Sequence, residues 1–246
     1  MDVPGVGGFV PGIGGAGAYA RRVVGVDEIV RRCAAAGIDL HGVTSAGAYD
    51  ALVDEPFRLG APADATVVVL GNTRAMWAPL TAWERAIGPH ADPVDTYVMQ
   101  VVRGATVDVD DVLDVRYSHE PPPRRIAIQR LADRAGLAWL SPSHLCVHPT
   151  YGPWLALRAA VVLARPCADE GTPAAPTCDC SGHCLPKLQQ AIAAGEPTNN
   201  AEMVAEWERW VAMRDACPLG HPYRYTDEQI RYHYLGERPE GWPALR

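Results

Sequence analysis

The sequence lacks the features that mark nucleic-acid-binding, membrane-spanning and disulfide-stabilised proteins. Only 21% of the residues are charged, and the net charge of −7 argues against a surface that binds nucleic-acid phosphates. No apolar run approaches the ~20 residues that a membrane helix needs. The N-terminus carries no basic segment followed by a hydrophobic one, so we expect no secretory signal. The 7 Cys residues form an odd number, which suits a reducing cytoplasm better than a disulfide framework.

Common catalytic signatures are also missing. The chain contains no nucleophile-elbow serine, no His-Glu-x-x-His helix and no phosphate-binding P-loop. Residues 1–19 are rich in glycine, but no strand signal precedes them and no Gly-Lys-Ser/Thr follows. We therefore expect residues 1–22 to form a flexible arm. At 246 residues and 48% hydrophobic, the chain is long enough for one sizeable core, and we expect residues 23–246 to form a single domain.

Apolar periodicity alternates between helix and strand along the chain, which predicts an α+β fold class. Thr66–Leu70 predicts a central strand, and Thr226 with Gln229 predicts a capping box at the start of a C-terminal helix. Asp92 followed by Pro93 predicts another helix start. Further helices are expected from Val26 to Gly37, around Leu80–Ile87, from Ile128 to Gly136, around Leu188–Ile192 and from Asn200 to Arg214. Further strands are expected at 107–117, 145–147 and 154–164.

The segment from His144 to Arg158 joins a short buried strand, a tight loop and a second strand. Arg158 interrupts the apolar run of that second strand. A guanidinium keeps its proton, so a buried one needs an anionic or strongly accepting partner. Two interpretations stay open: a structural ion pair, or a ligand site in which backbone N–H groups of the loop lie beside a fixed cation.

Several motifs occur in a defined order along the chain. They are Asp92-Pro93-Val94-Asp95, Arg124-Arg125, Cys146-Val147-His148-Pro149-x-Tyr151-Gly152-x-Trp154-x-Ala156-x-Arg158, Trp207-x-x-Trp210 with Arg214-Asp215-Ala216, and Arg224-Tyr225-Thr226-Asp227-Glu228-Gln229. From about Val26 to the C-terminus, this order resembles the cobalamin-processing family called CblC or MMACHC. The combination of His-Pro-x-Tyr-Gly-x-Trp with Arg-Tyr-Thr-x-Glu-Gln makes the resemblance specific.

The resemblance implies a nitroreductase-like α+β fold, with a mixed or antiparallel sheet flanked by helices and a helical C-terminal third. It implies a cytoplasmic enzyme that binds cobalamin base-off and removes its upper axial ligand. Alkyl groups would leave by dealkylation to a thiol cosubstrate such as glutathione, and cyanide by reductive decyanation with a flavin. The implied partners are a corrinoid and a small thiol, with a homodimer as a further expectation and no nucleic acid or membrane. Two alternatives stay open: a non-catalytic corrinoid carrier, and a flavin- or iron–sulfur-dependent reductase.

The resemblance also implies roles for individual residues. Arg158 and Arg214 stand where arginines of the family hold the carboxylates of the thiol, a task suited to the guanidinium fork. A third family arginine lies near the C-terminal end, where Arg238 and Arg246 are the candidates. The family has a corrin-contacting His in the helix after the Arg-Arg pair, and Asp133 stands at that position. The residues implied to line the corrin cavity are Cys146, Val147, His148, Tyr151, Gly152 and Trp154.

Three cysteines crowd together at Cys178, Cys180 and Cys184, with Cys167 before them. Thiolates this close could hold zinc or an iron–sulfur cluster, and disulfide exchange or free thiols are the alternatives. The CblC family has no counterpart of this cluster. A similar position after the same strand carries iron–sulfur ligands in the related epoxyqueuosine reductases, which also use cobalamin.

Overall fold

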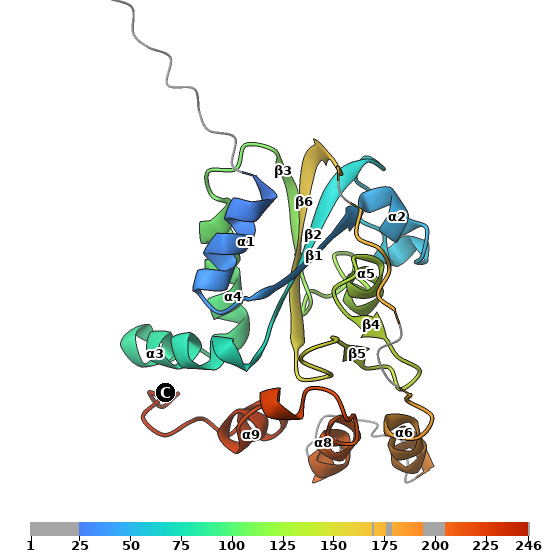
Figure 1. Ribbon diagram of the computed structural model, residues 1–246. Coiled ribbons are helices and arrows are strands. Elements are labelled where there is room, and N and C mark those ends of the chain that lie inside the picture. The colour runs from blue at the N-terminus through green and yellow to red at the C-terminus, as the bar shows by residue number, and fades with distance from the viewer. Residues whose placement is uncertain (1–24, 169, 176–178, 194–204, 246) are drawn as a thin grey trace, which may run out of the picture.

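The computed structural model describes residues 25–168, 170–175, 179–193 and 205–245. A four-stranded antiparallel sheet forms its centre (Figure 1). The strands, in spatial order, are β1 (Leu40–Ser45), β2 (Ala65–Asn72), β6 (Ala156–Pro166) and β3 (Val112–Tyr117). Two short strands, β4 (Trp139–Leu140) and β5 (Cys146–Val147), pair separately.

Helices cover both faces of the sheet. One face carries α1 (Val26–Ala35) and α4 (Pro93–Thr106), and the other carries α2 (Ala46–Asp50) and α5 (Ile128–Arg134) (Figure 1). The two inner strands feed both layers because successive side chains of a strand point to opposite faces. Val68 and Leu70 of β2 pack into the core with α1 and α4, whereas Val67 and Val69 pack into the core with α2 and α5.

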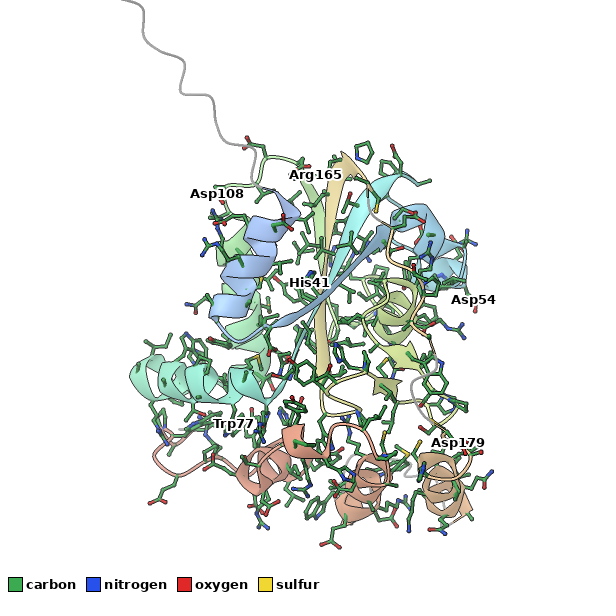
Figure 2. The ribbon with its side chains drawn as sticks, in the orientation of Figure 1. His41, Asp54, Trp77, Asp108, Arg165 and Asp179 are labelled. Atoms are coloured by element: carbon green, nitrogen blue, oxygen red, sulfur yellow. The ribbon has the colours of Figure 1, made fainter. Side chains whose placement is uncertain are left out.

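The C-terminal third forms a helical layer across the end of the sheet at which β6 begins. It contains α6 (Cys184–Ala193), α8 (Trp207–Asp215) and α9 (Asp227–Leu235) (Figure 1). Trp77, at the start of α3 (Trp77–Ile87), links this layer to the rest (labelled in Figure 2). Its Nε1 donates to Glu228 at 2.8 Å, and its ring lies 5.4 Å from that of Tyr232. Short 3-10 helices are η1 (Glu55–Phe57), η2 (Arg74–Met76) and η3 (His221–Tyr223).

The predicted α+β fold class is confirmed, with a fully antiparallel main sheet flanked by helices and a helical C-terminal third. The strands expected at 66–70, 145–147 and 154–164 correspond to β2, β5 and β6. Gly37 and Gly136, both at positive φ, follow α1 and α5 as expected. Among the described residues, no helix combines the length and the apolar character that crossing a membrane requires. The predicted N-terminal arm, Asn200 and Arg246 lie outside the described residues.

One edge strand, β1, was not predicted from the sequence, and the other, β3, is shorter than predicted. β1 carries Gly42 and His41, which weaken its strand signal, yet a Cβ on Gly42 would lie 2.7 Å from the Ala135 carbonyl oxygen. Glycine is therefore needed there for α5 to approach the sheet. The strand expected at 107–117 begins only at Val112, because α4 continues to Thr106 and a turn follows it.

Two predicted helix caps form only in part. Asp92 is the N-cap residue of α4, but its side chain makes no capping hydrogen bond. The Thr226 side chain caps α9 by accepting from the Gln229 backbone N–H at 3.2 Å. The reciprocal bond of a capping box is missing, because both polar atoms of the buried Gln229 side chain lack a hydrogen-bond partner.

Candidate functional site

The loop between β5 and β6 is closed by its own backbone. The His148 N–H donates to the Gly152 carbonyl at 2.9 Å, and the Gly152 N–H donates back at 2.8 Å. The His148 Nδ1 accepts from the backbone N–H groups of Thr150 and Tyr151 at 3.0 and 3.3 Å. Burial lowers the pKa of His148, which keeps the ring neutral and able to accept. His148 therefore holds the shape of this loop.

Two glycines bring this loop against the chain that follows α8. Gly152 has a φ of 56°, and a Cβ there would lie 2.1 Å from the Leu219 carbonyl oxygen. Gly220 has a φ of 78°, and a Cβ there would lie 2.0 Å from a carbonyl oxygen of the loop. Only glycine meets both demands. The same contact region brings Arg214 of α8 to the start of β6, where its Nη1 donates to the Pro153 carbonyl at 2.6 Å.

Three neighbouring cavities lie between this end of the sheet and the C-terminal helices. The apolar cavity, about 330 Å³, is lined by Ile128, Gln129, Leu145, Cys146, Pro153, Leu155, Ala156, Leu157 and Arg214. The central cavity, about 270 Å³, is lined by Trp154, Leu155, Ala156, Arg158, Arg214, Tyr225, His233 and Tyr234. The polar cavity, about 370 Å³, is lined by Ala91, Asp92, Val94, Asp95, Arg158, Tyr232, His233, Gly236, Arg238 and Leu245. Arg214 is common to the first two and Arg158 to the last two, so the three cavities lie next to one another in a row.

Arg158 is the extra residue of a β-bulge. In the pairing of β2 with β6, Leu70 faces Ala159 and Gly71 faces Leu157, so Arg158 has no opposite residue on β2. Bulges bend a strand and re-aim a side chain, and they are frequent next to functional sites. Here the bulge coincides with the residue that lines both the central and the polar cavity.

The Arg158 guanidinium has no carboxylate partner among the described residues. Its Nε donates to Oδ1 of the buried Asn72 at 2.6 Å, and Asn72 in turn donates to the Thr73 carbonyl at 2.7 Å. Burial lowers the pKa of Arg158, as expected for a cation removed from water. The structural ion pair considered from the sequence is therefore not found, and the fixed cation is presented to the cavities.

The central cavity gathers hydrogen-bond donors. Trp154 is 0% exposed and Tyr225 is 7% exposed, and neither the Trp154 Nε1 nor the Tyr225 Oη has a hydrogen-bond partner within the described structure. A buried polar group left unpaired costs about 1–3 kcal/mol. Together with Arg158 and Arg214, these groups surround a space whose lining holds no carboxylate. Such a cavity is suited to an anionic ligand, above all a carboxylate.

His233 lies in the wall shared by the central and polar cavities. Desolvation at the cavity wall, reinforced by the charges of Arg158 and Arg214, lowers the pKa of His233 to about 3, although the residue keeps an exposed face. The imidazole is thus neutral at physiological pH and offers one donor and one acceptor. The sequence analysis missed His233. Its signal is the run Tyr232-His233-Tyr234, in which polar aromatic residues occupy consecutive positions of a helix instead of one face.

Arg238 lines the polar cavity but is already paired. Its Nη2 donates to the carboxylate of Glu84, whose side chain is 0% exposed, and its Nη1 donates to the His90 carbonyl at 3.2 Å. Burial alone would raise the pKa of Glu84, but hydrogen bonds from His90 and Arg238 outweigh it and lower the pKa. The guanidinium also lies 5.0 Å from the Trp242 ring. Arg238 therefore joins the C-terminal tail to the segment after α3.

The residues expected to contact a corrin divide into two groups. Cys146 and Trp154 line cavities, and burial raises the pKa of Cys146 to about 12, so its thiol is protonated. Val147 is fully buried, and His148, Tyr151 and Gly152 build the loop behind the cavities.

Asp133 lies outside the described lining of the three cavities. Its Oδ1 accepts from the Leu140 N–H at 3.0 Å, which ties α5 to β4. Gln129, one helical turn earlier on α5, lines the apolar cavity instead, and its Nε2 donates to the His144 carbonyl at 2.9 Å. The sequence analysis missed Gln129, which the helix period places on the same side as Asp133.

The cysteine cluster is described only in part. Cys178 lies outside the described residues, and within the described part of the chain no three His, Cys, Asp or Glu residues are grouped as a metal site. Cys180 and Cys184 are buried in an apolar cluster with Leu188 and Met213, between α6 and α8.

No protein-family model matches the sequence, and no curated protein matches it either. Among solved structures, the chain is similar to the B12-trafficking protein CblC of C. elegans, a homologue of human MMACHC. The TM-score is 0.62 at 16% identity, covering 88% of this chain and 93% of that chain. It is also similar to epoxyqueuosine reductase from Bacillus subtilis, with a TM-score of 0.52 at 15% identity, covering 89% of this chain and 68% of that chain. The resemblance to CblC inferred from the motifs, and the nitroreductase-like fold class that it implied, are confirmed at the level of the fold.

Proposed function

We propose that this protein is a cobalamin-binding enzyme that removes the upper axial ligand of corrinoids, with a small thiol as cosubstrate. The observation that carries the proposal is Arg158, a half-buried cation on a β-bulge without a carboxylate partner among the described residues. It lies beside Arg214 and two unpartnered donors, which suits the carboxylate of a thiol. The CblC-like fold supports the corrinoid as the other substrate.

The cavities support a division of labour between the two substrates. A corrinoid is larger than a drug-sized ligand and would extend over more than one cavity. Leu145, Leu155 and Leu157 of the apolar cavity offer a dry wall for the corrin ring, while Gln129 offers an amide to one of its polar side chains. The thiol would then lie in the central cavity, directly beside it. Two reactants held next to each other gain the rate advantage of an intramolecular step.

The proposed dealkylation is a group transfer that balances without an external oxidant. The thiol loses its proton to water, and its sulfur forms a bond to the alkyl carbon. The cobalt–carbon bond breaks at the same time, and its electron pair stays on the corrinoid. Decyanation would instead need an electron donor such as a reduced flavin, with cyanide as the leaving group. In both reactions the chain supplies binding, orientation and exclusion of water.

The proposal is tested by the visible spectrum of methylcobalamin, kept in the dark with the protein, with and without glutathione. We expect binding to shift the spectrum, and the thiol to remove the methyl–cobalt spectrum. Arg158→Gln should keep corrinoid binding and lose about 10- to 1,000-fold in dealkylation rate, as expected for loss of about 1.5–4 kcal/mol from a charged hydrogen bond. Arg165→Gln is the matched control, because Arg165 lies on the same strand and pairs with Asp111 far from the cavities (Figure 2).

The same assay separates the rival functions. Corrinoid binding without any thiol-dependent loss of the methyl group would identify a carrier. A protein that never shifts the corrinoid spectrum would instead be tested as a flavin- or iron–sulfur-dependent reductase, by its own absorbance and by elemental analysis after anaerobic purification. Equal loss of activity in Arg158→Gln and Arg165→Gln would contradict the role proposed for Arg158.

A further inference from the structure

The central and polar cavities adjoin but differ in their charged side chains: the central cavity has arginines and no carboxylate in its lining, and the polar cavity has both arginines and aspartates. Arg158 and His233 form the wall between them. On the central side, Arg158 and Arg214 face a space without a carboxylate, and the buried Tyr225 Oη and Trp154 Nε1 lack partners. The two arginines and the Trp154 indole can only donate, and the Tyr225 hydroxyl can also donate, so a ligand rich in acceptors suits this side.

On the polar side, two carboxylates line the cavity. Asp92 is exposed, forms no ion pair with the described residues and does not cap α4 with its side chain, although it occupies the N-cap position. Asp95, in the first turn of α4, lies 3.3 Å from His119 and within electrostatic range of Arg158 across the polar cavity. Both residues belong to the N-terminal end of α4.

The positive charge of the polar cavity is largely compensated from within the protein. Arg238 is paired with the buried Glu84, and Arg158 stands at the wall where the anion of the central cavity would bind. Asp92 and Asp95 therefore remain to interact with a cation. A ligand that extends across the shared wall meets donors and positive charge at one end, and carboxylates at the other.

We propose that Asp92 and Asp95 bind the ammonium group of the thiol cosubstrate while Arg158 and Arg214 bind its carboxylate. This inference rests on the proposed function, because it assigns specificity to the same thiol site. It makes these aspartates specificity-determining residues. Thiols that carry both a carboxylate and a free amine would be accepted, and thiols whose amine is absent or acylated would be disfavoured.

Direct binding tests the inference without any corrinoid. The probes are S-methylglutathione and its N-acetylated form, in which an acetyl group replaces the positive charge of the amine. Neither probe carries a free thiol. By calorimetry, we expect wild type to bind the free amine about 10-fold or more tightly than the acylated form. The Asp92→Asn/Asp95→Asn double variant should lose that preference by weakening the free amine alone. The single variant Asp95→Asn decides the question if the double variant does not fold.

Asp54→Asn is the matched control. Asp54 is also an exposed N-cap residue without a capping bond and is followed by a helix with Pro in its first turn, but it lies far from the C-terminal helices (Figure 2). It should keep the full preference of wild type. Equal affinity of wild type for the two probes, equal weakening of both in the aspartate variants, or no binding of either probe would each overturn the inference. A failed corrinoid spectrum with an intact amine preference would instead overturn only the proposed corrinoid chemistry.

Discussion

Arg158 and Arg238 both line the polar cavity, but the structure predicts opposite consequences for stability when each is replaced by Met. Removal of Arg238 leaves the Glu84 carboxylate buried with His90 as its remaining partner. Breaking a buried pair in this way destabilises a protein by about 3–5 kcal/mol, and the bond from His90 places the expectation near the lower limit. We therefore expect Arg238→Met to lower the free energy of unfolding by about 3 kcal/mol.

Arg158→Met removes a cation that has no carboxylate partner among the described residues. The lost hydrogen bond to Asn72 is worth about 1.5–3 kcal/mol, while relief of the partial desolvation of this half-buried guanidinium returns a similar amount. The two effects nearly cancel, so we expect a change of less than about 1.5 kcal/mol. Urea denaturation followed by circular dichroism, with unchanged m-values, measures both variants on the same scale. The reasoning is refuted if Arg158→Met is destabilised as strongly as Arg238→Met.

Three further predictions follow from single features of the structure. His233→Gln should flatten the dependence of stability on pH between about 6.5 and 3. Because its lowered pKa makes the unfolded state bind more protons in that window, wild type loses stability as pH falls. The exposure of His233 to solvent reduces the size of this loss. Denaturation at several pH values would show the same slope in both proteins if the assignment is wrong. Gly152→Ala should lower the free energy of unfolding by more than about 2 kcal/mol, because the new Cβ clashes with a backbone carbonyl and the φ angle is positive. Gly60→Ala is the control: its φ is 67° but the space around it is open, so only the ~1 kcal/mol of backbone strain is expected. Equal shifts of the melting temperature in the two variants would contradict this. The double variant Cys178→Ser/Cys180→Ser should change the metal content of the protein or its requirement for an external thiol, while its corrinoid affinity stays intact. Elemental analysis and dealkylation assays measure the two effects. Unchanged metal content and unchanged kinetics would show that the cysteines neither bind metal nor act as thiols in the reaction.

The parts of the fold that the sequence could predict are those governed by local patterns. The apolar run of β2 predicted a central strand, and Thr226 predicted the cap of α9. β1 could not be predicted, because Gly42 is explained by the close approach of Ala135, about ninety residues later in the chain. The half-formed capping box has a related cause: the Gln229 side chain is buried by tertiary packing instead of turning back to Thr226.

The candidate site was predictable where a residue type conflicts with its surroundings. Arg158 stood out as a cation in an apolar strand, and that conflict pointed to a partner or a ligand. Asn72 did not stand out, because a polar residue at the end of a strand is common, although it is the residue that holds the guanidinium. His233 was hidden for a further reason: its lowered pKa depends on burial beside Arg158 and Arg214, which only the folded chain brings together.

The geometry of the site depends on two departures from regular structure that act together. The bulge at Arg158 turns a cation out of the pairing with β2, and the backbone contact between Gly152 and Gly220 holds the end of α8 against the start of the same strand. Without the bulge, side chains of β6 would alternate regularly between the two faces of the sheet, and the Arg158 side chain would point in a different direction. A larger residue at either glycine would separate Arg214 from Arg158 without touching any cavity-lining side chain. Ligand binding at this site is therefore coupled to the backbone conformation of Gly152 and Gly220, which line none of the three cavities. Substitution of either glycine should weaken thiol binding because it displaces Arg214 relative to Arg158.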